Sequence, residues 1–265
     1  MYLISIITIN LNDATGLERT LKSIENQTYE NIELIVVDGC STDNSLDVIR
    51  DFRPLISKSV VEKDHGLYDA MNKGISYATG DFALFLNSGD AFSEAHSLQI
   101  LASKIEDKNK LYFGRTKNIY NNSTIYYLPD FRITVDNYKS WLSQISPNHQ
   151  SILFPKSFYK TNSYDLKYKI ASDIDFKIKA INQLESVFVD AVVIDFELGG
   201  ISTLPRSLEL TTEMIAEGLE INKVNRRKLK LKTILGAVLN QYFKYLALKI
   251  LGEKRYFQLL GKILN

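Results

Sequence analysis

Four short stretches of the sequence place carboxylate and amide side chains directly after apolar runs. They are Thr8-Ile9-Asn10, Asp38 to Asp43, Asp64 to Gly74, and Asn87 to Asp90. Carboxylates without basic partners are typical of a site that binds a divalent cation and a phosphate-bearing ligand. The apolar runs are predicted to be parallel strands. The four stretches should therefore meet along one edge of one sheet, where open α/β sheets bind their ligands.

Two of these stretches also have purely structural explanations. Asp38, followed by Gly39, can form a turn or cap a helix, and residues 87–90 have the composition of a tight turn. In functional terms, Asp38 can accept a hydrogen bond from a nucleobase or a ribose hydroxyl. Asp90 can hold Mg²⁺ or Mn²⁺ together with the phosphates of a substrate. Taken alone, residues 87–90 are better explained as a turn.

The stretch from Asp64 to Gly74 is the most specific of the four. Gly66 permits close approach of the backbone to a ligand. The helix predicted behind it directs its N-terminus at the sheet edge, which suits an anion. Asp69 is expected to be a structural acid in the first helical turn, and Asn72 to be hydrogen-bonded within its own helix. His65 is expected to be an exposed loop residue.

Three later stretches carry further candidate groups. Asp173 lies where a loop leads into a helix, so it is either an N-terminal capping residue or a general base. His149, just before a predicted strand, is either a structural residue or a phosphate contact. The stretch 199–202, Gly-Gly-Ile-Ser, is either a flexible turn or a phosphate-binding or lid loop.

The elements that must position these groups alternate between strand and helix. Strands are predicted over 3–10, 32–37, 59–62 and 82–86, with helices over 13–26, 41–54 and 68–78. A hairpin turning at Asn121-Asn122, strands over 151–154 and 187–196, and a helix over 174–181 follow. Alternation at this spacing predicts an α/β fold with a parallel sheet and right-handed crossovers.

Composition excludes several classes of protein. With 265 residues, 45% of them hydrophobic, the chain is long enough for one large soluble domain with an appendage. A single cysteine, Cys40, excludes an internal disulfide framework and a thiolate zinc cluster. No secretory signal is expected at the N-terminus. No Gly-x-Gly-x-x-Gly follows the first strand and no P-loop motif occurs, which disfavours a dinucleotide oxidoreductase and a P-loop NTPase.

The net charge of +1 hides an asymmetry. Residues 222–265 contain eleven Lys and Arg and one acid, a net of +10, whereas residues 1–221 carry a net of −9. Apolar residues from Ile234 to Leu251 fall on one helical face, but polar residues interrupt the run, so it makes a poor transmembrane span. Such a basic tail favours an anionic membrane surface as partner. The alternative is a helical hairpin packed on the domain with its lysines solvated.

Taken in their order along the chain, these motifs resemble the inverting glycosyltransferases of family 2, which have the GT-A fold. The resemblance is strongest from Ile4 to Asp90 and continues more loosely to Ser202. The forms Asp64 to Gly74 and Leu86 to Asp90 are similar to the bacterial exopolysaccharide, capsule and O-antigen branch. The resemblance implies a central, mostly parallel twisted sheet flanked by helices, followed by a C-terminal amphipathic helical tail. It also implies sugar transfer from a UDP- or GDP-sugar to a hydroxyl of a lipid-linked glycan acceptor.

Carried over position by position, the resemblance implies a nucleotide site at the first three strand ends. Thr8 and Asn10 border the nucleotide pocket, Asp38 contacts the base, and Asp64 lies beside the nucleoside. Gly66 belongs to the same donor-binding set.

The resemblance likewise implies a metal acid and a base. Asp90 holds Mg²⁺ or Mn²⁺, Gly89 lies beside the donor, and Asp173 is the catalytic base. The sequence departs from the family's Asp-x-Asp-Asp form, because Asn87 and Gly89 replace two acids, so weaker metal affinity is expected. Ser172 stands where many members have Glu, which affects an expected acceptor contact.

The expected organisation is a glycosyltransferase domain over 1–221, with a nucleotide-binding half over 1–92 and an acceptor half over 93–221. The tail over 222–265 would hold the enzyme on the cytoplasmic, inner face of the cytoplasmic membrane. No nucleic-acid partner is expected, since no recognised module is present. Two other functions stay open: a nucleotide-sugar or glycan binding protein without turnover, and a sugar nucleotidyltransferase. The second would need a Gly-rich, Arg-containing loop after the first strand, which residues 11–16 lack.

Overall fold

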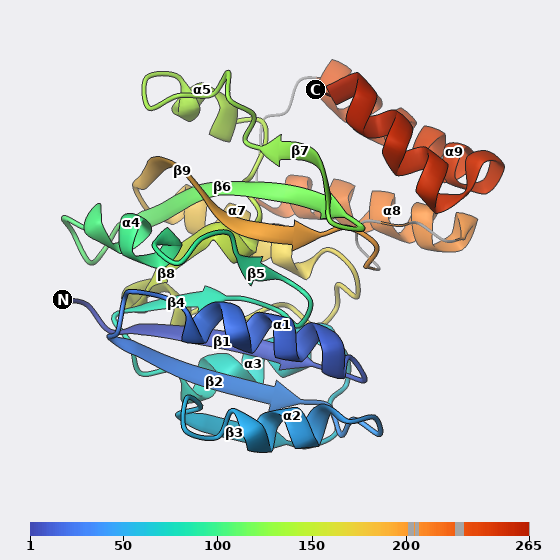
Figure 1. Ribbon diagram of the computed structural model, residues 1–265. Coiled ribbons are helices and arrows are strands. Elements are labelled where there is room, and N and C mark those ends of the chain that lie inside the picture. The colour runs from blue at the N-terminus through green and yellow to red at the C-terminus, as the bar shows by residue number, and fades with distance from the viewer. Residues whose placement is uncertain (201–203, 205–206, 226–230, 265) are drawn as a thin grey trace.

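The protein, seen here in a computed structural model, is built around one nine-stranded sheet (Figure 1). The structure describes residues 1–200, 204, 207–225 and 231–264. The strands are β1 (Ile4–Asn10), β2 (Ile32–Asp38), β3 (Lys58–Val61), β4 (Phe82–Phe85), β5 (Ala91–Phe92), β6 (Leu111–Tyr120), β7 (Ser123–Leu128), β8 (Ile152–Pro155) and β9 (Ser186–Glu197). Their order is β3-β2-β1-β4-β8-β6-β9-β5, with β7 beside β6.

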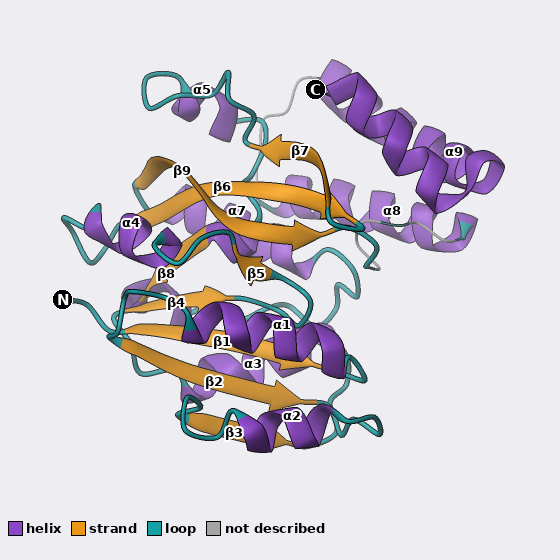
Figure 2. Ribbon diagram, viewed as in Figure 1, coloured by secondary structure: helices purple, strands orange, loops and turns teal. Residues whose placement is uncertain are grey.

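Helices cover both faces of this sheet (Figure 2). They are α1 (Ala14–Glu25), α2 (Ser45–Asp51), α3 (Leu67–Tyr77), α4 (Ser97–Ser103), α5 (Tyr138–Leu142), the 3-10 turn η1 (His149–Ser151), α6 (Lys156–Tyr159), α7 (Ser172–Gln183), α8 (Leu208–Val224) and α9 (Leu231–Leu264). Helices α1, α2 and α4 pack in one hydrophobic core, and α3, α5, α6 and α7 pack in the other.

Strand β1 is buried on both faces because it lies between β2 and β4 and beneath helices on each side. Ile4 and Ile6 point into the α1 core, whereas Ile7 and Ile9 point into the α3 core. This explains the unbroken apolar run, which is typical of a central parallel strand. Pairing across β3-β2-β1-β4 is parallel, as predicted, and places Asn10 opposite Asp38 at the carboxyl edge.

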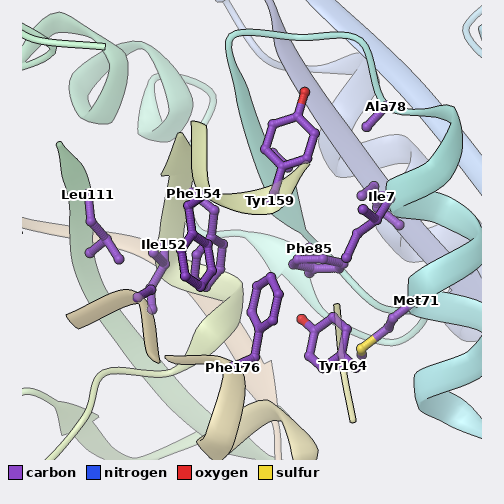
Figure 3. Packing of buried hydrophobic residues seen from close by; sticks show 14 of the residues in the cluster. Ile7, Met71, Ala78, Phe85, Leu111, Ile152, Phe154, Tyr159, Tyr164 and Phe176 are labelled. Carbon is purple, nitrogen blue, oxygen red and sulfur yellow. The ribbon is translucent and has the colours of Figure 1, made fainter. Parts of the chain in front are cut away.

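Beyond β4 the sheet is mixed. Strand β8 pairs antiparallel with both β4 and β6, and so joins the parallel strands β3, β2, β1 and β4 to the rest of the sheet. The predicted hairpin is present, with Asn121 and Asn122 both at positive φ. Aromatic rings fill the core where the halves meet: Tyr164 stacks on Phe176 with centroids 4.4 Å apart, and Phe85 lies edge-on to both (Figure 3).

The C-terminal region consists of two helices, of which α8 is absent from the sequence-based prediction. The predicted boundary between residues 221 and 222 falls inside α8. Helix α9 bends at Gly252 (φ 74°) and packs beside β7, where Tyr256 and Phe257 are buried against Ile125 and neighbouring residues. No helix in the described ranges is long and apolar enough to cross a bilayer.

One face of α9 stays exposed. The exposed stripe, as it is called below, consists of apolar residues at helical spacing: Leu235, Leu239, Tyr242, Phe243, Leu246 and Ile250. The tail is therefore packed on the domain along one side and open to solvent along the other.

Two phenylalanines on α9 allow this packing to be tested. Phe257 is 1% exposed and its ring centroid lies 4.3 Å from that of Tyr120, whereas Phe243 is 70% exposed. We expect Phe257→Ala to lower the free energy of unfolding by about 3 kcal/mol. Phe243→Ala should change it by less than about 0.5 kcal/mol. Urea denaturation measures both, and equal losses would contradict the described docking of α9.

Candidate active site

The ends of β1 and β2 are tied together by the carboxylate of Asp38. Asn10 Nδ2 donates to Asp38 Oδ2 over 2.8 Å, and the backbone N–H of Ser41 donates to Oδ1 over 2.7 Å. The Ser41 hydroxyl donates to Oδ2 over 2.7 Å. Asp38 is completely buried. The turn expected on structural grounds is thus present, and it fixes the Asp38 carboxylate at the carboxyl edge of the sheet.

Asp64 reaches the same edge because residue 39 has no side chain. A Cβ on Gly39 would lie 2.5 Å from Asp64 Oδ2, so any other residue at position 39 would displace the Asp64 carboxylate. Asp64 Oδ1 accepts the N–H of Gly66 over 2.9 Å, and Gly66 has φ 114°, a conformation that favours glycine. Glycines at 39 and 66 therefore let Asp64 lie beside the end of β2.

Several buried polar atoms at this edge lack a partner. Among the described residues, Thr8 Oγ1, Asn10 Oδ1 and Asn87 Oδ1 are buried without a hydrogen bond. Strand pairing keeps them close, since the N–H of Ser88 donates to the carbonyl of Ile9 over 3.1 Å. Buried polar atoms are normally hydrogen-bonded, so a group of exceptions at a strand edge is the mark of a ligand site.

The turn from Asn87 to Asp90 is anchored by a residue that the sequence did not single out. Thr20 Oγ1 accepts the N–H of Gly89 over 3.1 Å and donates to the carbonyl of Asp90 over 2.6 Å. Gly89 has φ 93°, in the left-handed region. Helix α1 thereby holds the turn that carries Asp90.

Asp90 is buried and bonded through both oxygens. Gln150 Nε2 donates to Oδ2 over 2.5 Å, and the N–H of Glu197 donates to Oδ1 over 2.7 Å. Gln150 also accepts the N–H of Asn87 over 2.8 Å. Burial raises the pKa of Asp90 to about 7, although the two N–H donors and the charge of Arg19 act in the opposite direction. The carboxylate is thus held in place by groups that favour its charged form.

Asp173, the second residue of α7, has three side chains close to its carboxylate. Lys177 Nζ is 3.1 Å and His149 Nδ1 is 3.6 Å from Oδ2, and the Tyr68 hydroxyl is 3.2 Å from Oδ1. Ala171, rather than Asp173, is the capping residue of the helix. Asp173 keeps 19% of its side chain exposed, so it is in contact with solvent.

The charge state of Asp173 follows from these neighbours. Burial raises its pKa, but Lys177, His149 and the hydrogen bonds outweigh burial and hold the pKa below its usual value. Burial also lowers the pKa of His149 to about 4, so this ring is neutral at neutral pH. Lys177 is therefore the cation that stabilises the Asp173 carboxylate.

Asp90 and Asp173 are each contacted by one of two consecutive residues of the same turn. In η1, Gln150 contacts Asp90 and His149 contacts Asp173. Sequence reasoning weighed His149 only as a structural residue or a phosphate contact and assigned Gln150 no part. A histidine and an amide next to each other before a strand were the available signal.

Helix α8 holds the segment that leads into Asp173. Glu217 is buried and accepts three consecutive N–H groups, those of Lys169, Ile170 and Ala171, at 2.7, 3.1 and 2.9 Å. These groups belong to the segment directly before α7, which ends at the capping residue Ala171. Glu217 thus fixes the loop that delivers Asp173.

The residues at the edge fit a hard divalent cation. Across the described ranges, no group of three or more His, Cys, Asp or Glu side chains is arranged for a metal ion. A Mg²⁺ site that uses substrate phosphates needs only one or two carboxylates, however. Asp90 and Asn87, whose Oδ1 has no hydrogen-bond partner, are the residues of this turn that would hold such a cation.

Three smaller expectations have different outcomes. Asp69 is structural, as expected: it accepts the N–H of His65 and pairs with Lys73. The expectation for Asn72 was wrong, because its side chain bonds the backbone of Tyr164 at both ends instead of its own helix. The predicted loop over 199–202 extends outside the described residues at 201 and 202.

Comparison with known sequences identifies relatives over most of the chain. The family model "Glycosyl transferase family 2" matches residues 5–173. An uncharacterized glycosyltransferase of Mycobacterium tuberculosis is 34% identical over 208 residues, which cover 76% of this chain and 77% of the relative. A PGL/p-HBAD biosynthesis glycosyltransferase of Mycobacterium bovis is 32% identical over 207 residues, covering 75% and 78%.

Solved structures share the fold at low sequence identity. S. aureus TarS in complex with UDP-GlcNAc aligns with 92% of this chain and 73% of its own, with a TM-score of 0.65 and 20% identity. Mannosyltransferase PcManGT from Pyrobaculum calidifontis, in complex with GDP-Man and Mn²⁺, aligns with 98% and 79%, with a TM-score of 0.61 and 16% identity. This likeness confirms the predicted GT-A fold.

Proposed function

The chain belongs to glycosyl transferase family 2, and we propose that it moves a sugar from a nucleoside-diphosphate sugar to an acceptor hydroxyl with inversion at the anomeric carbon. One observation carries this proposal. Asp90 and Asp173, 83 positions apart in the sequence, are contacted by the neighbouring residues Gln150 and His149. An acid suited to a diphosphate-bound cation and an acid suited to proton transfer therefore belong to one site.

The donor is proposed to lie along the ends of β1, β2 and β4. Asn10, Asp38 and Asp64 form its nucleoside end, and the unpartnered oxygens of Thr8 and Asn10 supply hydrogen-bond capacity there. The TarS and PcManGT complexes contain UDP-GlcNAc and GDP-Man, so a UDP- or GDP-sugar is the proposed donor class.

Asp173 is proposed to act as the general base. It takes the proton of the acceptor hydroxyl as that oxygen attacks the anomeric carbon from the face opposite the diphosphate. The bond between the sugar and the phosphate oxygen breaks with its electron pair leaving on the nucleoside diphosphate, so no covalent enzyme intermediate forms. When bound at Asp90, Mg²⁺ or Mn²⁺ would neutralise charge on the departing diphosphate.

The acceptor is proposed to be a lipid-linked glycan of bacterial surface polysaccharide synthesis. One relative is named for PGL/p-HBAD biosynthesis. In this chain, the exposed stripe of α9 is accompanied by exposed Lys249, Lys254 and Arg255. An apolar helical face bordered by cations suits an interface with anionic lipids. We place the enzyme at the inner face of the cytoplasmic membrane on this basis.

A substitution at the base tests the transfer mechanism. We expect Asp173→Asn to bind UDP or GDP with Mn²⁺ as wild type does, because the donor residues are untouched. Transfer should fall by about 10²- to 10⁴-fold, the usual contribution of a general base. Calorimetry measures binding, and chromatography of donor and product measures transfer.

Asp136→Asn, in an exposed loop, is the matched control and should transfer normally. Full turnover by Asp173→Asn would contradict the base assignment. Donor binding by wild type without product from any acceptor would instead favour the nucleotide-sugar binding protein, a function consistent with the acids missing at Asn87 and Gly89.

A second experiment tests the membrane surface. The triple variant Leu239→Glu, Phe243→Glu, Ile250→Glu changes only exposed positions on α9, so the fold should be retained. Flotation with phosphatidylglycerol vesicles should show vesicle binding reduced by at least about tenfold, since apolar burial and anionic attraction are both lost. Leu219→Glu, at an exposed position of α8, is the control. Undiminished flotation of the triple variant would exclude the stripe as a lipid contact.

A further inference from the structure

Lys177 is an unusually placed lysine. Its side chain is only 8% exposed, and within the described part of the chain its one ion pair is with Asp173, four residues earlier on α7. Burying an ammonium group costs free energy, and pairing it with a buried carboxylate recovers only part of that cost. We therefore expect this ion pair to have a function. Sequence reasoning gave Lys177 none.

A neighbouring pair shows what distinguishes this one. Lys179 pairs with Asp175 at the same four-residue spacing, over 2.6 Å. Asp175 is only 1% exposed and also accepts the Asn225 side chain, so it is closed to an incoming hydroxyl. Asp173 is 19% exposed, so of these two ion-paired acids it is the one that a substrate can reach.

The groups that face Asp173 leave one oxygen available. Lys177 and His149 lie toward Oδ2. The Tyr68 hydroxyl lies 2.6 Å from the carbonyl of Ile170 and 3.2 Å from Oδ1, so Oδ1 accepts at most one hydrogen bond from it. Tyr164 contributes a buried ring close enough to feel the Asp173 charge. Oδ1 therefore retains lone pairs for a proton.

We propose that Lys177 is a positioning residue that holds Asp173 ionised through Oδ2 and so leaves Oδ1 as the oxygen that takes the acceptor proton. This inference rests on the proposed role of Asp173 as general base. On transfer, the acceptor O–H proton moves to Oδ1 while the new glycosidic bond forms and the diphosphate leaves. The retained charge of Lys177 then favours return of that proton to solvent, which readies Asp173 for the next cycle.

The proton affinity of Asp173 can be measured without any substrate. Protein labelled with ¹³C at aspartate carboxyls gives a signal for Asp173, assigned by its absence in Asp173→Asn. In wild type we expect this signal to titrate below the ordinary aspartate range. In Lys177→Met, the midpoint should move up by about one to three pH units, the usual effect of removing an adjacent opposite charge.

Matched variants separate charge from packing. Lys177→Gln keeps a donor without the charge and should show the same upward shift, whereas Lys177→Arg should titrate close to wild type. Lys179→Met removes a lysine two residues away and should leave the Asp173 midpoint unchanged. An unshifted midpoint in both Lys177→Met and Lys177→Gln would overturn the proposal, and the second variant serves if the first does not fold.

The pH profile of transfer gives the second readout. For donor turnover with UDP-GlcNAc or GDP-mannose as the probe, the acid limb of kcat/KM should move upward in Lys177→Met, with activity recovering at higher pH. An equal loss at every pH would contradict a role through ionisation. Failure of the base assignment is distinguishable, since Asp173→Asn would then stay active whatever the titration of Asp173 showed.

Discussion

Two carboxylates lie in surroundings that are largely removed from water, and the rest of the site depends on the groups that favour their charged forms against burial. Asp90 is stabilised by N–H donors from Gln150 and the backbone of Glu197, and Asp173 by the ammonium of Lys177. Burial opposes ionisation at both positions. Turn η1 contacts Asp173 through His149 and Asp90 through Gln150, and it leads directly into β8, which joins the two parts of the sheet.

The fold serves this constraint by bringing distant elements to one edge. Parallel pairing aligns the ends of β1, β2 and β4, Gly39 admits the Asp64 carboxylate, and Thr20 of α1 secures the turn before Asp90. Helix α8 acts from the far side through Glu217. Side-chain oxygens of Thr8, Asn10 and Asn87 remain buried without a hydrogen-bond partner. Buried polar atoms without partners are expected at ligand-binding sites, because the ligand supplies the missing hydrogen bonds.

The sequence predicted the strands and helices of residues 1–86 well, because apolar runs buried on both faces and glycines at turns reflect local constraints. The strands other than β5, the hairpin at Asn121-Asn122 and the helix of Asp173 were predicted, whereas the short helices α4, α5 and α6 were not. Contacts between residues far apart in the sequence were not predicted, because they leave no periodic pattern. Examples are Gln150 with Asp90, Glu217 with the loop before α7, and Asn72 with Tyr164. Helix α8 did have a local signal in the sequence, because Ser207 caps it by accepting the N–H of Leu210. The amphipathic pattern of the tail predicted a helix, but it did not predict which side of that helix packs against the domain.

The most direct test is to locate a bound cation in solution. In ¹⁵N-labelled protein given Mn²⁺ with UDP or GDP, paramagnetic broadening should be strongest for the amides of Asp90 and Glu197 and the side-chain amide of Gln150, and should weaken without nucleotide. The acidic groove between α1 and α2, lined by Glu18, Asp47 and Asp51 among others, provides an internal comparison. Broadening centred on that groove, with sharp signals around Asp90, would contradict a cation-bound diphosphate at the sheet edge.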